Sequence, residues 1–205
     1  MEPGAALRRA ATMRSRTSST HARSGGTGQA GSAAAVVLAA GAGSRFGGPK
    51  QALLLPGVLD RVHESSVDDV LVVVGAHPLE VDVRTVTCPD WKRGPGASLS
   101  CGLEALGEEV EAAVVVLADG PDLAPEAIDR VIHAWRQGAG EIVAASYGGN
   151  RGHPVLLARS IWSRIPDEGA RALDPVLIPC DDLGSPGDVD LADEIPGRLR
   201  EEPGE

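Results

Sequence analysis

The sequence has few aromatic residues and lacks any long apolar run. Aromatic residues make up 2% of the 205 residues, whereas 42% are hydrophobic. A core must therefore be built from Val, Leu and Ala, which suits parallel strands covered by helices. No apolar stretch reaches the roughly 18 residues of a membrane span, and the first residues lack the apolar centre of a secretory signal. We expect one α/β domain that does not bind membranes, since domains typically have about 100–200 residues.

The three cysteines, Cys88, Cys101 and Cys180, are far apart in the sequence and form no C-x-x-C pair. An odd number at this spacing argues against a disulfide framework and against a zinc knuckle. Free thiols are typical of a reducing compartment. The cysteines therefore predict a cytoplasmic protein.

Negative charge dominates the sequence except at its start. The net charge is -10, yet residues 1–32 carry five arginines against one glutamate, so the remainder carries -14. A body this acidic repels a polyanion, which argues against nucleic acid as a general partner. Small anionic ligands remain compatible with it wherever cationic side chains converge.

Residues 1–32 are rich in Arg, Ser, Thr and Gly and have almost no large apolar side chains. Such a segment cannot bury enough surface to offset the entropy of ordering, so we predict a disordered basic tail. Its composition also fits an organelle transit peptide or an arm that touches nucleic acid. A start of translation at Met13 or later is a further interpretation.

Apolar runs alternate with helical patterns from residue 33 onward. Four runs are continuous rather than alternating in polarity, which predicts strands buried on both faces. They span 33–40, 70–76, 112–119 and 141–146, and helical spacing predicts helices over 98–110 and 125–138. This order predicts a three-layer α/β/α sandwich with a mostly parallel sheet and ligands at the carboxyl ends of its strands. We assign residues 33–197 to this domain and expect 198–205 to be a frayed end.

A glycine-rich turn follows the first predicted strand, in "VVLAAGAGSRFGGPKQALLLPG" (36–57). A P-loop needs a lysine directly after its second glycine and then a hydroxyl that binds magnesium. Gly43 and Gly48 have the required spacing, but Pro49 intervenes and Gln51 follows Lys50. The match therefore fails at the two positions that bind phosphate and magnesium in a P-loop.

The dinucleotide pattern G-x-G-x-x-G also fails, because Phe46 stands where the third glycine allows close helix packing. The turn still offers backbone that can approach an anion at Gly41 and Gly43. An arginine fork at Arg45 and a point charge at Lys50 could surround a triphosphate. Taken alone, the turn could equally be a surface loop with solvated Arg and Lys side chains.

The segment "LAAGAGSRFGGPKQALL" resembles the signature L-A-[AG]-G-x-G-x-R-[FM]-G-x-x-K-x-L-L of the molybdenum cofactor cytidylyl- and guanylyltransferases. These enzymes belong to the wider nucleotide-diphospho-sugar transferase fold. Five further blocks follow in the family's order: "CPDWKRGPGASLSCGLEAL" (88–106), "VVVLADGPDL" (114–123), "GNRGHPVLL" (149–157), "DEGARALD" (167–174) and "DVDLADE" (188–194). The resemblance covers about residues 35–194.

The resemblance implies nucleotidyl transfer, in which an acceptor phosphate attacks the α-phosphate of a nucleoside triphosphate and pyrophosphate leaves. Catalysis would depend on Arg45, Lys50 and Asp119, which place charge around the reacting phosphates. The nucleotide would contact Arg45 and Lys50 together with six other residues. These are Leu38, Ala39, Ala40, Gly41, Gly43 and Ser98.

The resemblance also implies a Mg²⁺ site, because magnesium takes one or two carboxylates together with phosphate oxygens. Asp119 would be the first carboxylate and Asp190 the second, with Asp188 as its competitor. In the alternative interpretation Asp119 merely caps the following turn, although Asp122 is the better candidate for a cap. The acidic segment 188–194 could likewise be a solvated loop.

His153 and Arg171 would bind the acceptor, because they match the family's acceptor-side blocks. The alternatives are a structural histidine, a surface salt bridge at Arg171, and a Ser98 that only caps its helix. Ala40 stands where the guanylyl branch tends to have glycine, which favours CTP as the donor. Molybdopterin is then the expected acceptor, and a molybdoenzyme is a further expected partner.

Two departures from the family pattern bear on these expectations. Only residues 57–66 are available for a crossover helix that is usually longer, so a covering helix could be truncated. Cys88 replaces a common asparagine, which suggests a buried filler. The rival functions are transfer to another acceptor such as a sugar phosphate, and a catalytically weak nucleotide-binding accessory protein.

Overall fold

The computed structural model describes residues 31–43, 50–185 and 187. The strands are β1 (Ala33–Ala39), β2 (Asp69–Val74), β3 (Arg84–Thr87), β4 (Ala112–Leu117), β5 (Ile142–Tyr147), β6 (Asn150–Ala158) and β7 (Val176–Pro179). The helices are α1 (Lys50–His63), α2 (Pro95–Glu104) and α3 (Pro125–Arg136). Short 3-10 segments are η1 (Trp91–Arg93), η2 (Arg159–Arg164), η3 (Gly169–Ala172) and η4 (Asp181–Leu183).

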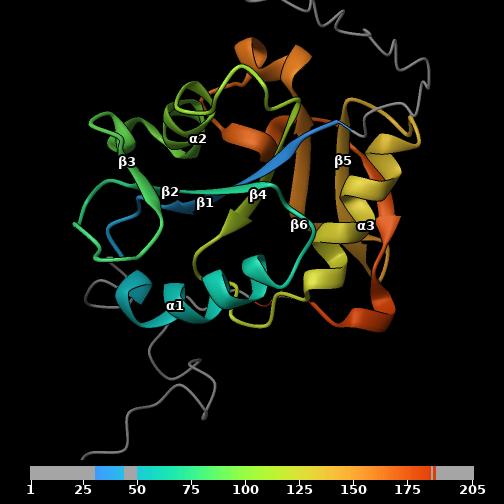
Figure 1. The fold of residues 1–205 in the computed structure, drawn as a ribbon, viewed down its shortest axis with the longest axis horizontal. Helices are drawn as coiled ribbons and strands as arrows, with labels where there is room; N and C mark the ends of the chain where they lie inside the picture. The colour runs from blue at the N-terminus through green and yellow to red at the C-terminus, as the bar shows by residue number, and fades with distance from the viewer. Residues whose placement is uncertain (1–30, 44–49, 186, 188–205) are drawn as a thin grey trace, which may run out of the picture.

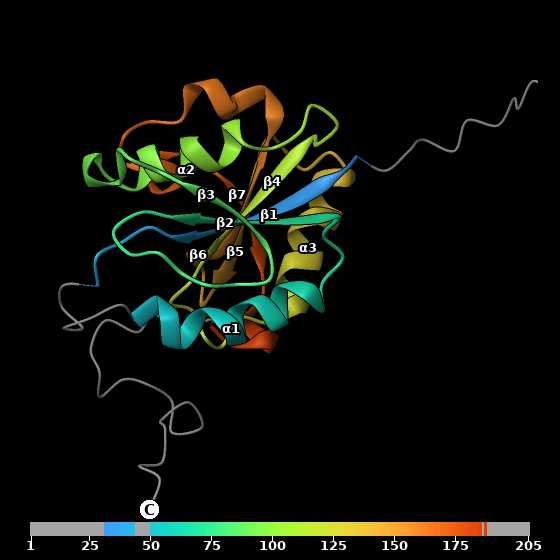
Figure 2. The same cartoon turned by 60° about the vertical axis from the view of Figure 1, so that its left-hand side comes forward.

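One sheet forms the middle layer, with the strand order β3-β2-β1-β4-β6-β5-β7. Its strands run parallel except β6, which is antiparallel to both of its neighbours. Helices α1 and α3 cover one face and α2 covers the other (Figures 1 and 2). The predicted three-layer α/β/α sandwich with a mostly parallel sheet is confirmed.

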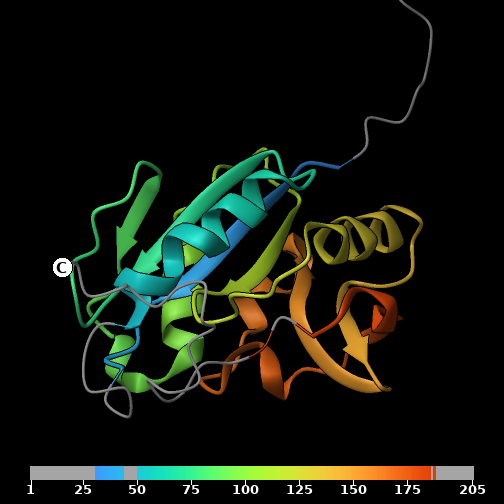
Figure 3. The same ribbon diagram turned by 90° about the horizontal axis from the view of Figure 1, so that it is seen from below.

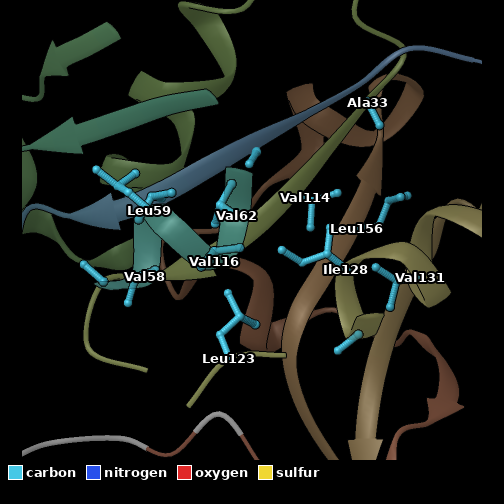
Figure 4. Packing of buried hydrophobic residues seen from close by; sticks show 14 of the residues in the cluster. Ala33, Val58, Leu59, Val62, Val114, Val116, Leu123, Ile128, Val131 and Leu156 are labelled. Carbon is cyan, nitrogen blue, oxygen red and sulfur yellow. The ribbon is translucent and has the colours of Figure 1, made fainter. Parts of the chain in front are cut away.

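Each face of the sheet has its own apolar core, and strand β1 contributes alternate residues to the two. Ala35 and Val37 face α1 and α3, whereas Ala34 and Val36 face α2. Figure 4 shows the first core, in which Val58 of α1 and Ile128 of α3 meet the sheet. Burial on both faces explains why the strands read as continuous apolar runs.

The expected truncation of the first crossover helix is wrong. Helix α1 has 14 residues because it begins at Lys50, seven residues before the segment 57–66 that the sequence analysis assigns to the crossover helix. It lies along the sheet (Figure 3). Pro56, inside this helix, is exposed. After Lys50 and Gln51 in its first turn, its buried side is apolar and consists of Leu54, Leu55, Val58, Leu59 and Val62. This face of the sheet therefore has a complete cover.

The predicted strands match β1, β2, β4 and β5, and the predicted helices match α2 and α3 to within a turn or two. The sequence reading missed β3, β6 and β7. Strands β5 and β6 form a hairpin whose turn residues, Gly148 and Gly149, both have positive φ. A Gly-Gly pair is a known signal for such a turn, and it was available in the sequence.

The expectation that the cysteines stay unpaired is wrong for two of them, because Cys88 and Cys101 form a disulfide. Cys88 directly follows β3 and Cys101 lies on α2, and packing brings their Cα atoms to 5.7 Å. Cys180 is buried and free. Sequence spacing could not reveal a pair that only the docking of α2 creates. The cytoplasmic location stays a prediction.

Two helical glycines differ in their surroundings, which gives a stability prediction. A Cβ on Gly102 of α2 would lie 2.6 Å from Val36 and 2.8 Å from Val73, whereas a Cβ on Gly57 of α1 would meet nothing within 4 Å. We expect Gly102→Ala to lower the free energy of unfolding by about 1–3 kcal/mol through overpacking. Gly57→Ala should raise it by about 1 kcal/mol, since alanine is the better helix former. Urea titrations of both variants test this, and equal effects would contradict it.

Several predicted features lie outside the described residues. They are the basic tail apart from residues 31 and 32, Arg45, Asp188, Asp190 and the C-terminal end. In the part of the chain that the structure describes, no helix combines the length and apolarity that a membrane crossing requires.

Candidate functional site

The carboxyl ends of β1 and β4 lie side by side and create the candidate site. Leu38 pairs with Leu117 across the two parallel strands, and the backbone amide of Ala118 donates to the carbonyl of Leu38 at 3.2 Å. This register places Ala39 and Ala40 beside the chain that leads to Asp119. The edge is the one where parallel sheets bind ligands.

An ion pair at this edge joins the first residue of α1 to the segment that follows β4. The Lys50 Nζ atom lies 2.8 Å from Oδ2 of Asp119. Lys50 is the first residue of α1, and its side chain is only 8% exposed, whereas that of Asp119 is 24% exposed. The structure thus brings together two of the three predicted catalytic residues. Arg45, the third, lies outside the described residues.

Side chains from two other segments hold the glycine-rich turn. The Gln51 side-chain amide donates to the Gly41 carbonyl at 3.2 Å, and Nε2 of His77 lies 3.2 Å from the Ala42 carbonyl. Gly43 has a φ of 62°, which glycine adopts without strain. Sequence analysis assigned no role to Gln51 or His77, because nothing in the local pattern shows that they meet this turn.

A cavity of about 310 Å³ lies where the end of β4 and the start of β6 meet Ser185 and Gly187. Its walls include Leu117 at the end of β4, Gly120 next to Asp119 in the sequence, and Arg151 and His153 of β6. The antiparallel pairing of β4 with β6 ends at Val115 and Val155, two residues from Leu117 and from His153. The Asp119 carboxylate is close enough to influence the pKa of His153, so the predicted acceptor residue lies near one partner of the ion pair.

Burial sets the protonation state of His153. It lowers the pKa of His153 to about 4, with help from the Arg151 cation and against the influence of the Asp119 carboxylate. The imidazole is therefore neutral at pH 7, and its backbone carbonyl accepts a hydrogen bond from the Tyr147 hydroxyl at 3.0 Å. A neutral imidazole in a cavity can donate or accept one hydrogen bond at each ring nitrogen.

This lowered pKa predicts a pH dependence of stability. Between about pH 6.5 and pH 4 the unfolded chain binds more protons at His153 than the folded chain does. The free energy of unfolding should therefore fall as the pH is lowered through this window, and His153→Gln should remove that part of the fall. Urea titrations at pH 6.5 and 4.5 measure it, with His133→Gln on the exposed side of α3 as the control. An unchanged pH dependence in His153→Gln would contradict the prediction.

Arg151 lines the cavity and forms hydrogen bonds with the backbone in and after η3. Its guanidinium donates to the carbonyls of Ala170 and Leu173 at 2.6 Å each and to that of Arg171 at 3.3 Å. Burial lowers the pKa of Arg151. The side chain of Arg171 is exposed on η3. The two arginines thus differ in position, and Arg151, which sequence analysis did not single out, is the one that lines the cavity.

Helices α2 and α3 both begin without a side-chain cap. The N-cap of α2 is Gly94, so Ser98 lies buried at the end of the first turn instead of at the N-cap. The N-cap of α3 is Ala124, two residues after Asp122. Pro95 and Pro125 begin these helices and set the first turn without a side-chain cap. The capping interpretation of Ser98 is therefore wrong, whereas a cap of the turn after β4 by Asp122 stays a prediction.

Asp119 is the described carboxylate that suits a divalent cation at this edge. Among residues 31–43, 50–185 and 187, no three His, Cys, Asp or Glu side chains form a metal-binding cluster. A single carboxylate supplemented by phosphate oxygens is nevertheless a usual magnesium environment. Asp119 fits that role, and the predicted second ligand, Asp190, lies outside the described residues.

Comparison with known proteins identifies solved structures that share this fold. The homologue of Mycobacterium tuberculosis Rv0371c from Mycobacterium sp. strain JC1 is 25% identical, with a TM-score of 0.66 over 78% of this chain and 91% of its own. Rv0371c from M. tuberculosis H37Rv is 26% identical, with a TM-score of 0.65 over 80% and 95%. A second structure of Rv0371c is a complex with manganese, with 23% identity and a TM-score of 0.58 over 72% and 88%.

The molybdopterin-guanine dinucleotide biosynthesis protein A of Archaeoglobus fulgidus shares the fold at 14% identity, with a TM-score of 0.54 over 73% of this chain and 85% of its own. No curated protein matches the sequence. The profile of the MobA-like NTP transferase domain matches residues 35–175, which include the glycine-rich turn, Asp119 and every cavity-lining residue except Ser185 and Gly187. The chain therefore belongs to the family of MobA-like NTP transferase domains.

Proposed function

We propose that this protein transfers a nucleoside monophosphate, CMP from CTP, to a phosphorylated acceptor of the molybdopterin class and releases pyrophosphate. The observation that carries the proposal is the ion pair between Lys50 and Asp119 at the carboxyl edge of the sheet. One partner can bind phosphate and the other a cation, and the cavity that Gly120 lines, next to Asp119 in the sequence, would take the acceptor. Molybdopterin and CTP come from the sequence resemblance, which the family membership supports at the level of nucleotidyl transfer.

The residues of the chain would act by position and charge. An acceptor phosphate oxygen attacks the α-phosphate in line with the departing pyrophosphate, so catalysis needs alignment and charge neutralisation more than covalent chemistry. Lys50 would contact the β- and γ-phosphates, where negative charge builds up as pyrophosphate leaves. We assign Arg45 the same task. The turn held by Gln51 and His77 would present its backbone, with Leu38 to Ala40, to the nucleotide.

We propose Mg²⁺ as the cofactor, held by Asp119 and phosphate oxygens, with Asp190 as a further ligand. When bound, the cation would neutralise the phosphates and orient them. The manganese in the Rv0371c structure supports a divalent cation in a protein of this fold.

The cavity beside Asp119 is the proposed acceptor site. Arg151 gives it a cation, and His153 gives it a neutral group that forms hydrogen bonds. Both suit a phosphorylated molecule with polar ring atoms. We also propose that Arg171 reaches the acceptor from η3 and that Ser98 contributes to the nucleotide side. A molybdoenzyme would then receive the finished cofactor.

A panel of nucleotides and acceptors tests this function. Pyrophosphate release is measured with CTP, GTP, ATP and UTP, each with purified molybdopterin or a sugar phosphate, with and without Mg²⁺. We expect release with CTP and molybdopterin, and only with the metal. Release with a sugar phosphate alone would replace the acceptor in the proposal. Binding without turnover in every combination would favour an accessory protein, although the complete helix α1 removes the structural reason for that reading.

A further inference from the structure

The disulfide between Cys88 and Cys101 spans the segment that connects β3 to α2. Cys88 directly follows β3 and is fully buried, whereas Cys101 lies on α2 and is partly exposed. Between the two cysteines lie η1 and the first turn of α2, which ends at Ser98 of the predicted nucleotide side. The proposed nucleotidyl transfer gives this pair of sulfurs no task.

Helix α2 is held on the sheet by apolar packing that does not involve the disulfide. Its side chains Leu99 and Leu103 are buried. Gly102 lies so close to the sheet that a Cβ there would be 2.6 Å from Val36 and 2.8 Å from Val73. Burial of this kind stabilises a helix without a covalent link. We therefore expect α2 to stay in place when the disulfide is open.

The surroundings of the pair suit thiols as well as a disulfide. The Ala97 carbonyl lies 3.4 Å from Sγ of Cys88, so it can accept a hydrogen bond from this sulfur when it is a thiol. Cys101 is partly exposed, which gives a dissolved thiol a route to the bridge. Thiol–disulfide exchange depends on such access. The bridge can therefore open and close in the folded protein.

Backbone hydrogen bonds connect the buried end of the bridge with the glycine-rich turn. The Cys88 amide donates to the Val74 carbonyl at 2.8 Å. Two residues further on, the Ala76 amide donates to the Ala40 carbonyl at 3.0 Å. The end of β2 thus lies between the disulfide and a predicted nucleotide contact.

The segment between the cysteines, residues 89–97, also contacts this edge directly. Trp91 packs so closely on Gly75 that a Cβ on this glycine would lie 2.8 Å from Trp91. The Gly96 amide donates to the Asp167 carbonyl at 3.0 Å, just before η3. With the bridge open, segment 89–97 is held by fewer contacts, so local opening costs less free energy. A looser segment would hold both of these neighbours less firmly.

We propose that Cys88 and Cys101 form a redox modification site, whose disulfide exchanges with low-molecular-weight thiols and controls how tightly the nucleotide side of the site is held. This inference goes beyond the proposed function and rests on it only for the nucleotide whose binding is controlled. The closed bridge is the form with high nucleotide affinity, and the open dithiol is the form with low affinity.

The exchange proceeds through a mixed disulfide. A thiolate of the small thiol attacks Sγ of Cys101, the bond between the cysteine sulfurs breaks, and Cys88 leaves as a thiolate that takes a proton from water. A second small thiolate attacks the small-molecule sulfur of the mixed disulfide, and Cys101 leaves and is protonated in the same way. The protein disulfide is thereby reduced, and the small thiol is oxidised to its own disulfide. The reverse reaction uses that small disulfide as the oxidant.

The first experiment counts thiols in the full chain. The protein is equilibrated with different ratios of reduced to oxidised glutathione, quenched with acid, alkylated in denaturant and weighed by mass spectrometry. The count should rise reversibly from one, which is Cys180, to three, with the circular dichroism unchanged. A count of one in every buffer would make the bridge a fixed link, and a count of three in every buffer would mean that no bridge forms. Either result overturns the proposal.

The second experiment locates the change in the wild-type protein. Hydrogen–deuterium exchange is compared between the oxidised and the reduced form. Amides of segment 89–97 should exchange faster in the reduced form, whereas those of α3, on the opposite face of the sheet, should not change. Equal exchange of segment 89–97 in both forms would contradict the proposed loosening.

The third experiment measures equilibrium dialysis of CTP with Mg²⁺ against both forms. Reduced wild-type protein should bind at least about fivefold more weakly than oxidised protein. The control is Cys101→Ser, a substitution at a partly exposed position that cannot form the bridge. Its affinity should equal that of the reduced wild type and should not respond to glutathione.

The outcomes separate this inference from the proposed function. Equal CTP affinity of the oxidised and reduced wild type overturns the inference and leaves the proposed function standing. Absence of CTP binding in both forms contradicts the proposed function and, with it, the control of nucleotide binding. The thiol count and the hydrogen exchange then still decide whether the pair is a redox modification site.

Discussion

Replacement of Lys50 by alanine should lower the rate of nucleotidyl transfer by about 100- to 1000-fold, which is the range seen when one group that stabilises a developing charge is removed. The Lys50 ammonium is 2.8 Å from Asp119, so it lies at the cation side of the proposed site. Water that fills the vacated space cannot supply a fixed positive charge there. The loss should appear mainly in kcat, because the negative charge grows as pyrophosphate leaves.

The fold should survive this change. Helix α1 is anchored by Leu54, Leu55, Val58, Leu59 and Val62, which are all buried. Pyrophosphate release under saturating nucleotide measures kcat, and circular dichroism checks the fold. Lys92→Ala should retain wild-type turnover, since Lys92 is exposed on η1. A Lys50→Ala rate close to that of the wild type would remove Lys50 from catalysis.

Replacement of Asp119 by asparagine should lower turnover by a similar factor, about 100- to 1000-fold, for a different reason. The amide keeps the shape of the side chain but has no anionic oxygen for a hard cation. Asp119 lies two residues after the end of β4, and the pairing of that strand with β1 holds the chain before it at the carboxyl edge. The change therefore alters charge at this point with little change in packing.

Two further observations would identify the cause of this loss. Raising the Mg²⁺ concentration should restore only a small part of the Asp119→Asn rate, because the ligand itself is missing. Asp82→Asn, the exposed control, should behave as the wild type does. An Asp119→Asn variant with normal turnover and unchanged metal requirement would show that Asp119 is structural.

The sequence by itself determined the fold class and the edge of the sheet at which the candidate site lies. The continuous apolar runs predict strands buried on both faces, and β1, β2, β4 and β5 follow them closely. Because these strands are parallel, the residues that follow β1 and β4 had to meet at one edge. The proximity of Lys50 and Asp119 is the direct result.

Only the tertiary structure decided the contacts that depend on how separate elements dock. Gln51 and His77 hold the glycine-rich turn, and Arg151 holds η3, through hydrogen bonds to backbone carbonyls. A carbonyl is present in every residue, so no sequence pattern marks it as the partner of a distant side chain. The pairing of Cys88 with Cys101 likewise depends on where α2 packs. Local periodicity sets the elements, whereas these long-range contacts are set by the packing of the layers.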